Sequence, residues 1–257
     1  MQVTKSPGLE GYAAFYRKST SMRLARPSKY WLPELMWIAA VVVGGDATAD
    51  LDSDSGIWGV VSASGSAAAL SPKLEGFRWW IDTQVRFRDN VGDFGQSIIR
   101  PGIGYAFFPE VTVWLGYGWI RSSPENGRDI DEHRIWQQLS WGRDLDPVQV
   151  TTRTRIEQRF REDGDDTGGR FRQKIGASYP LSSRFDLIAS DEAFVNLNST
   201  DWGADSGFDQ NRMFAGFRWK ANQHVHLEIG YLNKFTNRCG RNDEMNHIAM
   251  ITLQLKP

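Results

Sequence analysis

Charged side chains occupy every second position between Thr152 and Arg161, where the chain reads Thr-Arg-Thr-Arg-Ile-Glu-Gln-Arg-Phe-Arg. Successive side chains of a β-strand point to opposite faces, so such a strand has one ionic face and one that is mostly apolar. Similar alternation recurs along the chain, and it predicts an all-β fold whose strands each carry two unlike faces. No segment predicts a helix, a domain linker or a solenoid repeat.

Eleven alternating segments are separated by links of two kinds. We expect strands at 57–69, 76–88, 96–107, 110–121, 132–143, 147–161, 169–179, 183–196, 207–220, 223–235 and 244–255. Short links at 108–110, 144–147, 180–183 and 221–223 contrast with longer, Gly-, Asp- and Asn-rich links at 122–131, 162–168, 197–206 and 236–243. This layout is typical of an antiparallel up-and-down transmembrane β-barrel, which in bacteria has an even number of strands. We therefore expect twelve strands, one of them hidden in residues 50–75, with ten as the fallback.

Three features favour a barrel with its charged face inward and its apolar face towards lipid. The expected strands often exceed ten residues, against ~5–6 in soluble proteins. The charges are mostly Arg, whose forked guanidinium pairs with carboxylates where water is scarce. Aromatic residues gather near the expected strand ends, as in the girdles at membrane interfaces. These residues are Trp79, Trp80, Trp114, Trp119, Trp141, Tyr179, Trp219 and Tyr231. The alternative is a secreted soluble barrel with the apolar face inside.

The inward face predicts a network of Arg–carboxylate pairs that crosses an Arg-rich lumen. Its expected members are Arg86, Arg100, Glu132, Arg134, Arg153, Arg155, Glu157, Arg159, Arg172, Glu192, Arg212, Arg218 and Glu228. Gln137 falls on the opposite, lipid-facing side beside Ile135 and Leu139, so we expect a bulge or a register change there.

Composition narrows the alternatives. The 257 residues carry 30 Lys plus Arg against 31 Asp plus Glu, and this balance gives no indication of nucleic-acid binding. Mean hydropathy is −0.45, and no apolar run approaches the ~20 residues of a transmembrane helix. A single cysteine, Cys239, excludes an internal disulfide.

The N-terminal segment predicts a signal peptide over residues 1–49, ahead of a barrel domain over 50–257. Basic residues precede the apolar run Leu35–Val43, and the small-x-small triplet Ala47–Ala49 follows it. This order is that of a secretory signal. Met22 begins an ordinary charged region, so Met22 is an alternative translation start to Met1. The alternative is a buried helix of a soluble domain.

Several short motifs resemble those of an uncharacterised Gram-negative family, domain-of-unknown-function family 2490. The motifs are Arg100-Pro-Gly-Ile-Gly-Tyr105, Gly116-Tyr117, Glu132-His-Arg-Ile-Trp-Gln-Gln138, Arg153-x-Arg-x-Glu-Gln-Arg-Phe160, Gln210-Asn-Arg212 and Glu228-Ile-Gly-Tyr231. The resemblance covers most of the chain after residue 49. The resemblance implies an outer-membrane β-barrel and supplies no catalytic residue.

No constellation of catalytic or metal-binding residues emerges from the sequence, and we expect no cofactor. His224 and His226 lie two apart on one expected strand, but a third metal ligand is not evident. His133 and His247 are expected to face lipid, where outer-membrane lipid-modifying enzymes carry a His and a Ser, yet neither has a Ser two residues away. Such an enzyme should bring one of these rings to a Ser hydroxyl from a neighbouring strand. Acidic residues in the long links could bind Ca²⁺ or serve as solvated loop charges.

These observations predict a protein of the cell outer membrane. We expect a narrow or closed channel, or a structural membrane component, with outer-membrane lipid and the barrel-assembly machinery as its partners and no nucleic acid. A lipid-modifying enzyme and a secreted soluble binding barrel are the alternatives. The sequence does not define an oligomeric state or a solute.

Overall fold

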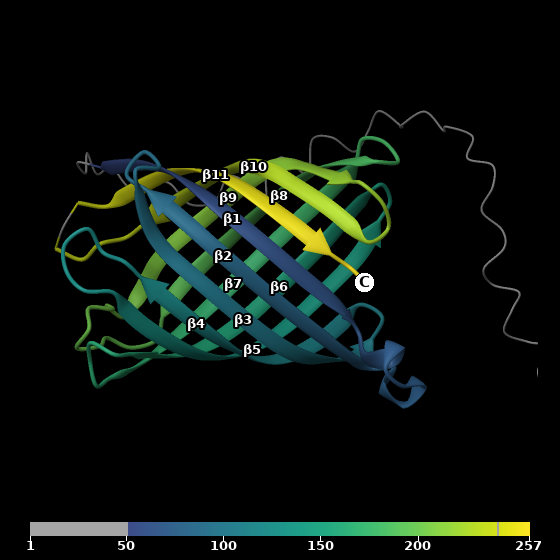
Figure 1. The fold of residues 1–257 in the computed structure, drawn as a ribbon, viewed down its shortest axis with the longest axis horizontal. Helices are drawn as coiled ribbons and strands as arrows, with labels where there is room; N and C mark the ends of the chain where they lie inside the picture. Colours follow the sequence, from purple (N-terminus) through teal and green to yellow (C-terminus); the bar gives the residue numbers. More distant parts are fainter. Residues whose placement is uncertain (1–50, 241) are drawn as a thin grey trace, which may run out of the picture. The chain divides into compact units, whose positions relative to one another are not determined.

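The computed structural model describes residues 51–240 and 242–257, and these residues form a closed β-barrel (Figure 1). Eleven strands make its wall. They are β1 (Asp52–Ser66), β2 (Phe77–Arg88), β3 (Asp93–Phe108), β4 (Val111–Ser122), β5 (Ile130–Leu145), β6 (Val148–Arg161), β7 (Thr167–Pro180), β8 (Phe185–Asn196), β9 (Gly207–Lys220), β10 (Val225–Thr236) and β11 (Glu244–Leu255). Each strand pairs antiparallel with its neighbour in sequence, and β1 closes the barrel by pairing parallel with β11.

The strand count of the described residues differs from the expected twelve and from the fallback of ten. All eleven segments expected from alternation are strands, but none is hidden in 50–75 beyond β1 itself. An even count is required only when the first and last strands run antiparallel. Here Asp52 to Ala63 pair in parallel with Glu244 to Leu255, so an odd number of strands closes the barrel.

The link between β1 and β2 contains helical turns that the sequence did not predict. Two 3₁₀ helices, η2 (Ala67–Ala69) and η3 (Pro72–Leu74), follow β1, which ends at Ser66 rather than at residue 69. The Ser66 hydroxyl accepts a hydrogen bond from the backbone N–H of Ala68, and the Ser71 hydroxyl accepts one from Lys73. Serine caps of this kind satisfy the first free N–H groups of a helical turn.

The two ends of the barrel differ. The short-turn end carries the links 67–76, 109–110, 146–147, 181–184 and 221–224, and the long-loop end carries the links 89–92, 123–129, 162–166, 197–206 and 237–243. Because β1 and β11 are parallel, β1 starts at the long-loop end and the C-terminus leaves at the short-turn end, on the right in Figure 1. The expected signal peptide over residues 1–49 lies outside the described residues.

Burial is inverted relative to a soluble barrel. On β6, Arg155 and Glu157 have an exposed fraction of 0%, whereas Ile156 is 43% and Phe160 is 40% exposed. The same alternation runs round the wall, so that buried residues are mostly Arg, Glu, Asp and Gln while Ile, Leu, Val, Phe and Tyr are exposed outside. The charged face predicted from the sequence therefore lines the interior.

Two local expectations are wrong. Gln137 causes no bulge, because β5 and β6 keep one continuous register from Glu132 to Leu145. Its amide instead pairs on the outer face with that of Gln158, 3.1 and 3.2 Å between nitrogen and oxygen in the two directions. Each polar amide is thereby satisfied without a break in the ladder.

Trp80 and Trp114 do not belong to an outer girdle. Both lie on the inward face, and their ring centroids are 6.4 Å apart in an edge-to-face arrangement. Trp80 shares its face with the buried Asp82, two positions away, which the alternation of the strand requires. Of the other expected girdle residues, Tyr179, Trp219 and Tyr231 are exposed on the outside.

Candidate functional site

The centre of the lumen is a cluster of Arg side chains around the buried Glu157. Arg170 donates to Oε2 at 3.1 and 2.7 Å, and Arg172 donates to Oε1 at 2.6 Å. Arg155 and Arg134 lie farther away, at 3.6 and 3.9 Å. Four guanidinium groups on β5, β6 and β7 therefore converge on one carboxylate, and hydrogen bonds to charged groups are among the stronger contacts a protein makes.

Two further carboxylates connect neighbouring strands to this centre. Glu132 accepts from Arg134 and Arg159, each at 2.6 Å. Glu192 accepts from Arg153 at 2.8 Å and from Arg172 at 2.7 Å. Arg172 thus bridges Glu157 and Glu192, and Arg134 reaches from Glu132 towards Glu157.

The remaining predicted pairs lie on either side of this network. Arg100 forms a forked pair with Asp82 at 2.8 and 2.9 Å. Near the short-turn end, Arg218 pairs with Glu228 at 2.7 Å and lies 3.6 Å from Asp186.

Arg86 and Arg212, also among the predicted members, make no ion pair with a carboxylate in the part of the chain that the structure describes. Arg86 donates to the side-chain oxygens of Gln84 and Gln96 at 2.6 and 2.8 Å. Both guanidinium groups lie against the ring of Trp58, at 3.8 and 5.0 Å from its centroid. The Nε atoms of both are buried without a hydrogen-bond partner.

The predicted set leaves out several polar residues that share the inward face. Asp186 accepts from Lys220 at 2.7 Å, and the Gln138 carbonyl oxygen accepts from Arg155 at 2.8 and 2.5 Å. Lys234 lies directly opposite Arg212 across β9 and β10. Each has the same parity as a predicted member of its own strand, so extending the alternation to the strand ends identifies all of them.

Aromatic rings also pack in the lumen beside the Arg cluster. Trp136 is fully buried, its ring packs edge-to-face against Trp80 at 5.5 Å, and Arg155 lies 4.2 Å from its centroid. The ring occupies space left by two glycines. A Cβ atom on Gly116 or Gly102 would lie only 2.0 or 2.5 Å from it. The glycines of the Arg100–Tyr105 and Gly116-Tyr117 motifs thus make room for this indole.

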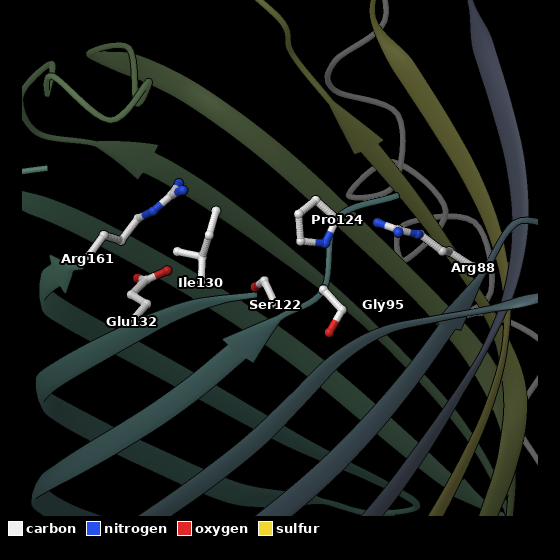
Figure 2. A pocket seen from close by; sticks show the side chains of 8 residues that line it. Arg88, Gly95, Ser122, Pro124, Ile130, Glu132 and Arg161 are labelled. Atoms are coloured by element: carbon white, nitrogen blue, oxygen red, sulfur yellow. The ribbon is translucent and has the colours of Figure 1, made fainter. Parts of the chain in front are cut away.

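Two adjoining cavities occupy the long-loop half of the lumen. The larger, of about 320 Å³, is lined by residues from the long-loop half of the strands and by Trp202, Gly203 and Ala204 of the β8–β9 loop. The smaller, of about 250 Å³, lies beneath the β4–β5 loop (Figure 2). Figure 2 shows Arg161 and Arg88 at its two ends with Ile130, Ser122 and Pro124 between them. Ser122, Glu132 and Arg161 line both cavities.

The β6–β7 and β8–β9 loops are tied together above the larger cavity. The Asp201 carboxylate accepts from the backbone N–H groups of Asp165 and Asp166 at 2.9 and 3.2 Å, and these bonds, that of Asp165 foremost, hold the pKa of Asp201 below its usual value. The Trp202 indole donates to the Asp166 carbonyl at 2.8 Å, and its ring lies 4.8 Å from the Arg159 guanidinium. Acidic side chains in these loops thus bind backbone groups of the protein.

Each outward-facing His contacts a Tyr. Tyr117 and His133 join through the hydroxyl and Nδ1 at 2.5 Å, and Tyr231 and His247 do so at the same distance. Among the described residues, neither ring is hydrogen-bonded to a Ser hydroxyl. His224 lies in the turn before β10 rather than on the strand, and its Nδ1 faces the Lys256 carbonyl oxygen at 2.8 Å.

The residues in 51–240 and 242–257 contain no group of three or more His, Cys, Asp or Glu that could hold a metal ion. Within the same described ranges, no helix is long and apolar enough to cross a membrane.

The chain was compared with known proteins by sequence and by structure. The chain is 27% identical over 220 residues to an uncharacterised protein of Methylorubrum extorquens strain AM1, a match that covers 84% of this chain and 93% of that protein. Among solved structures it is similar to NanC porin, with a TM-score of 0.44 and 14% identity over 65% of this chain and 80% of that chain. The family model described as "Protein of unknown function (DUF2490)" matches residues 55–246, most of the chain. The chain therefore belongs to the DUF2490 family.

Proposed function

We propose that this protein is an outer-membrane β-barrel that acts as a narrow or closed, anion-favouring channel. The inverted burial carries the proposal. An outer wall of exposed apolar side chains around the whole barrel is far larger than the apolar patches that water-soluble monomers expose. Lipid is the environment that makes such a wall favourable, and a closed barrel leaves no strand edge unpaired within it.

The filling of the lumen supports a narrow path. Barrels of 16–18 strands hold an aqueous channel, whereas ~8 strands leave room only for side chains. With eleven strands the interior side chains decide. The Trp136 and Trp80 rings and the Glu157 cluster occupy the middle and the short-turn half, while the cavities lie in the long-loop half. The path that remains is lined mainly by guanidinium groups, which attract anions and repel cations.

Conductance in planar bilayers tests the channel. Refolded protein of residues 50–257 should give small or no currents, and any current should favour anions over cations. Trp136→Ala, which opens the filled half, should raise the conductance, and Trp219→Ala on the outer wall is its matched control. A large, cation-selective current from the unaltered protein contradicts the proposal.

Cell fractionation tests the location. The protein should be recovered with the outer membrane and should run faster on gels before heating than after, because a closed barrel resists detergent until heated. Recovery in the soluble periplasm without detergent would instead support the secreted barrel. Residues 1–49 as a cleaved signal, outer-membrane lipid and the barrel-assembly machinery as partners, and a Gram-negative source belong to the same proposal.

The lipid-modifying enzyme has no specific support. It needs a nucleophilic hydroxyl beside His133 or His247, and the group hydrogen-bonded to each ring is a Tyr hydroxyl. We therefore do not propose it.

A further inference from the structure

The larger cavity carries far more positive than negative charge. Nine cationic side chains line it against two carboxylates, Glu132 and Asp209, a formal balance of +7. Six of these nine cations form ion pairs with carboxylates in or around the cavity. Three do not: Arg86, Arg212 and Lys234 make no ion pair within the described residues.

These three cations lie together. Lys234 faces Arg212 directly across β9 and β10, and Arg86 and Arg212 both contact the Trp58 ring. Glu192 is the cross-strand neighbour of Arg212, but its oxygen accepts from Arg153 and Arg172 instead. Like charges this close repel one another strongly in a partly buried site. Among the described residues, no carboxylate forms an ion pair with any of the three cations to offset this repulsion.

We infer that this cavity binds a small multivalent oxyanion, such as a phosphate or carboxylate compound, which enters from the long-loop end. Arg forks recognise the planar edges of both oxyanion types, and all three cations without an ion pair, Arg86, Arg212 and Lys234, line the cavity. The volume of about 320 Å³ is at the lower end of the ~300–1,000 Å³ range of small-molecule sites. Trp202 and Gly203 of the β8–β9 loop form part of the lining.

The inference rests on the proposed function only in that the bound anion is the solute a guanidinium-lined barrel would admit. Binding does not require conduction. Saturable anion binding by a barrel with a large, cation-selective current would keep the inference and remove the proposed function. Small, anion-favouring currents or none, without anion binding, would do the reverse.

Isothermal titration calorimetry tests whether the larger cavity binds an oxyanion. The refolded barrel is kept in a non-ionic detergent at low salt, and inorganic pyrophosphate and citrate are the probes. We expect saturable binding at one site per barrel that weakens as salt is added. Binding of pyrophosphate alone assigns the site to phosphate compounds, binding of citrate alone to polycarboxylates, and binding of both to oxyanions in general. Binding of neither probe overturns the inference.

Variants locate the site. Arg212→Gln and Lys234→Gln should each weaken binding roughly ten- to hundredfold, as expected for the loss of a hydrogen bond to a charged group. The matched control is Lys174→Gln, an inward-facing lysine outside the cavity that also makes no ion pair in the described structure. Heat-modifiable mobility checks that each variant has folded. An equal loss of affinity in the control would mean that the lumen attracts anions without a site, and would overturn the inference.

Discussion

Removing the Glu157 carboxylate should destabilise the barrel more than any loop substitution. Glu157 is fully buried and receives three hydrogen bonds from Arg170 and Arg172. In Glu157→Ala, Arg172 keeps Glu192, with distances of 2.9 and 2.7 Å. Arg170 keeps only Asp209 at 3.7 Å.

Two guanidinium groups are therefore left without a close carboxylate, namely Arg170 and the fully buried Arg155, which retains Gln138. Deleting one partner of a buried pair costs about 3–5 kcal/mol, because the remaining charge is left uncompensated. Glu157→Gln should cost less, since one acceptor oxygen remains. Asp165→Ala removes an exposed loop carboxylate and should stay within about 0.5 kcal/mol of the unaltered protein.

Urea unfolding of refolded protein measures these differences. With a slope of about 2 kcal/mol per molar urea, a loss of about 4 kcal/mol lowers the midpoint by about 2 M. A double variant, Glu157→Ala with Arg170→Ala, should recover part of the loss, because the second change removes a charge that the first left unpaired. If Glu157→Ala and Asp165→Ala have equal midpoints, the charged face is solvated and the reasoning fails.

Three further outcomes are expected. Gly116→Ala should lower the free energy of unfolding by about 1–3 kcal/mol, because the added Cβ meets the Trp136 ring. Gly142→Ala is the control, since its Cβ makes only ordinary contacts. Equal urea midpoints for the two variants would contradict this packing. Asp201→Ala should speed hydrogen exchange in 162–166 and 197–206, with Asp205→Ala as the control. Since folding lowers the pKa of Asp201, the loop contact should persist at neutral pH and weaken only below the ordinary value of 3.8, which exchange at decreasing pH would check. N-terminal sequencing of protein from the outer membrane should begin at Asp50, and a start upstream of Met36 would exclude the signal peptide.

The alternation in the sequence was sufficient to predict the strands and their faces but not the partners. Every expected segment is a strand, and Arg155 and Glu157 are as buried as their parity requires. Arg172, by contrast, lies opposite Arg155 in register, yet its guanidinium bonds Glu157 and Glu192, which lie diagonally across two different strands. Diagonal neighbours lie within reach of long side chains. The pairing therefore depends on how the strands meet in space, which alternation does not specify.

The prediction that Trp80 and Trp114 lie in an outer girdle was wrong for a related reason. A Trp near a strand end suits a membrane interface, and this general preference outweighed the parity of Trp80 and Trp114. Parity gives the correct face for both, and the glycines opposite them are the second signal. Gly104 leaves the space that the Trp114 ring occupies, as Gly116 does for Trp136.

The uneven charge of the lumen distinguishes a binding site from a filled core. In the short-turn half, Arg218 and Lys220 each have a carboxylate, so the side chains there neutralise one another as they fill the space. In the long-loop half, Arg212 and Lys234 face each other without one. A lumen that only needed filling would gain stability by exchanging either cation for a neutral side chain, because unpaired like charges are costly where water is limited. Residues that break such a rule without compensation in the fold are expected at functional sites, and three of them, Arg86, Arg212 and Lys234, line one cavity.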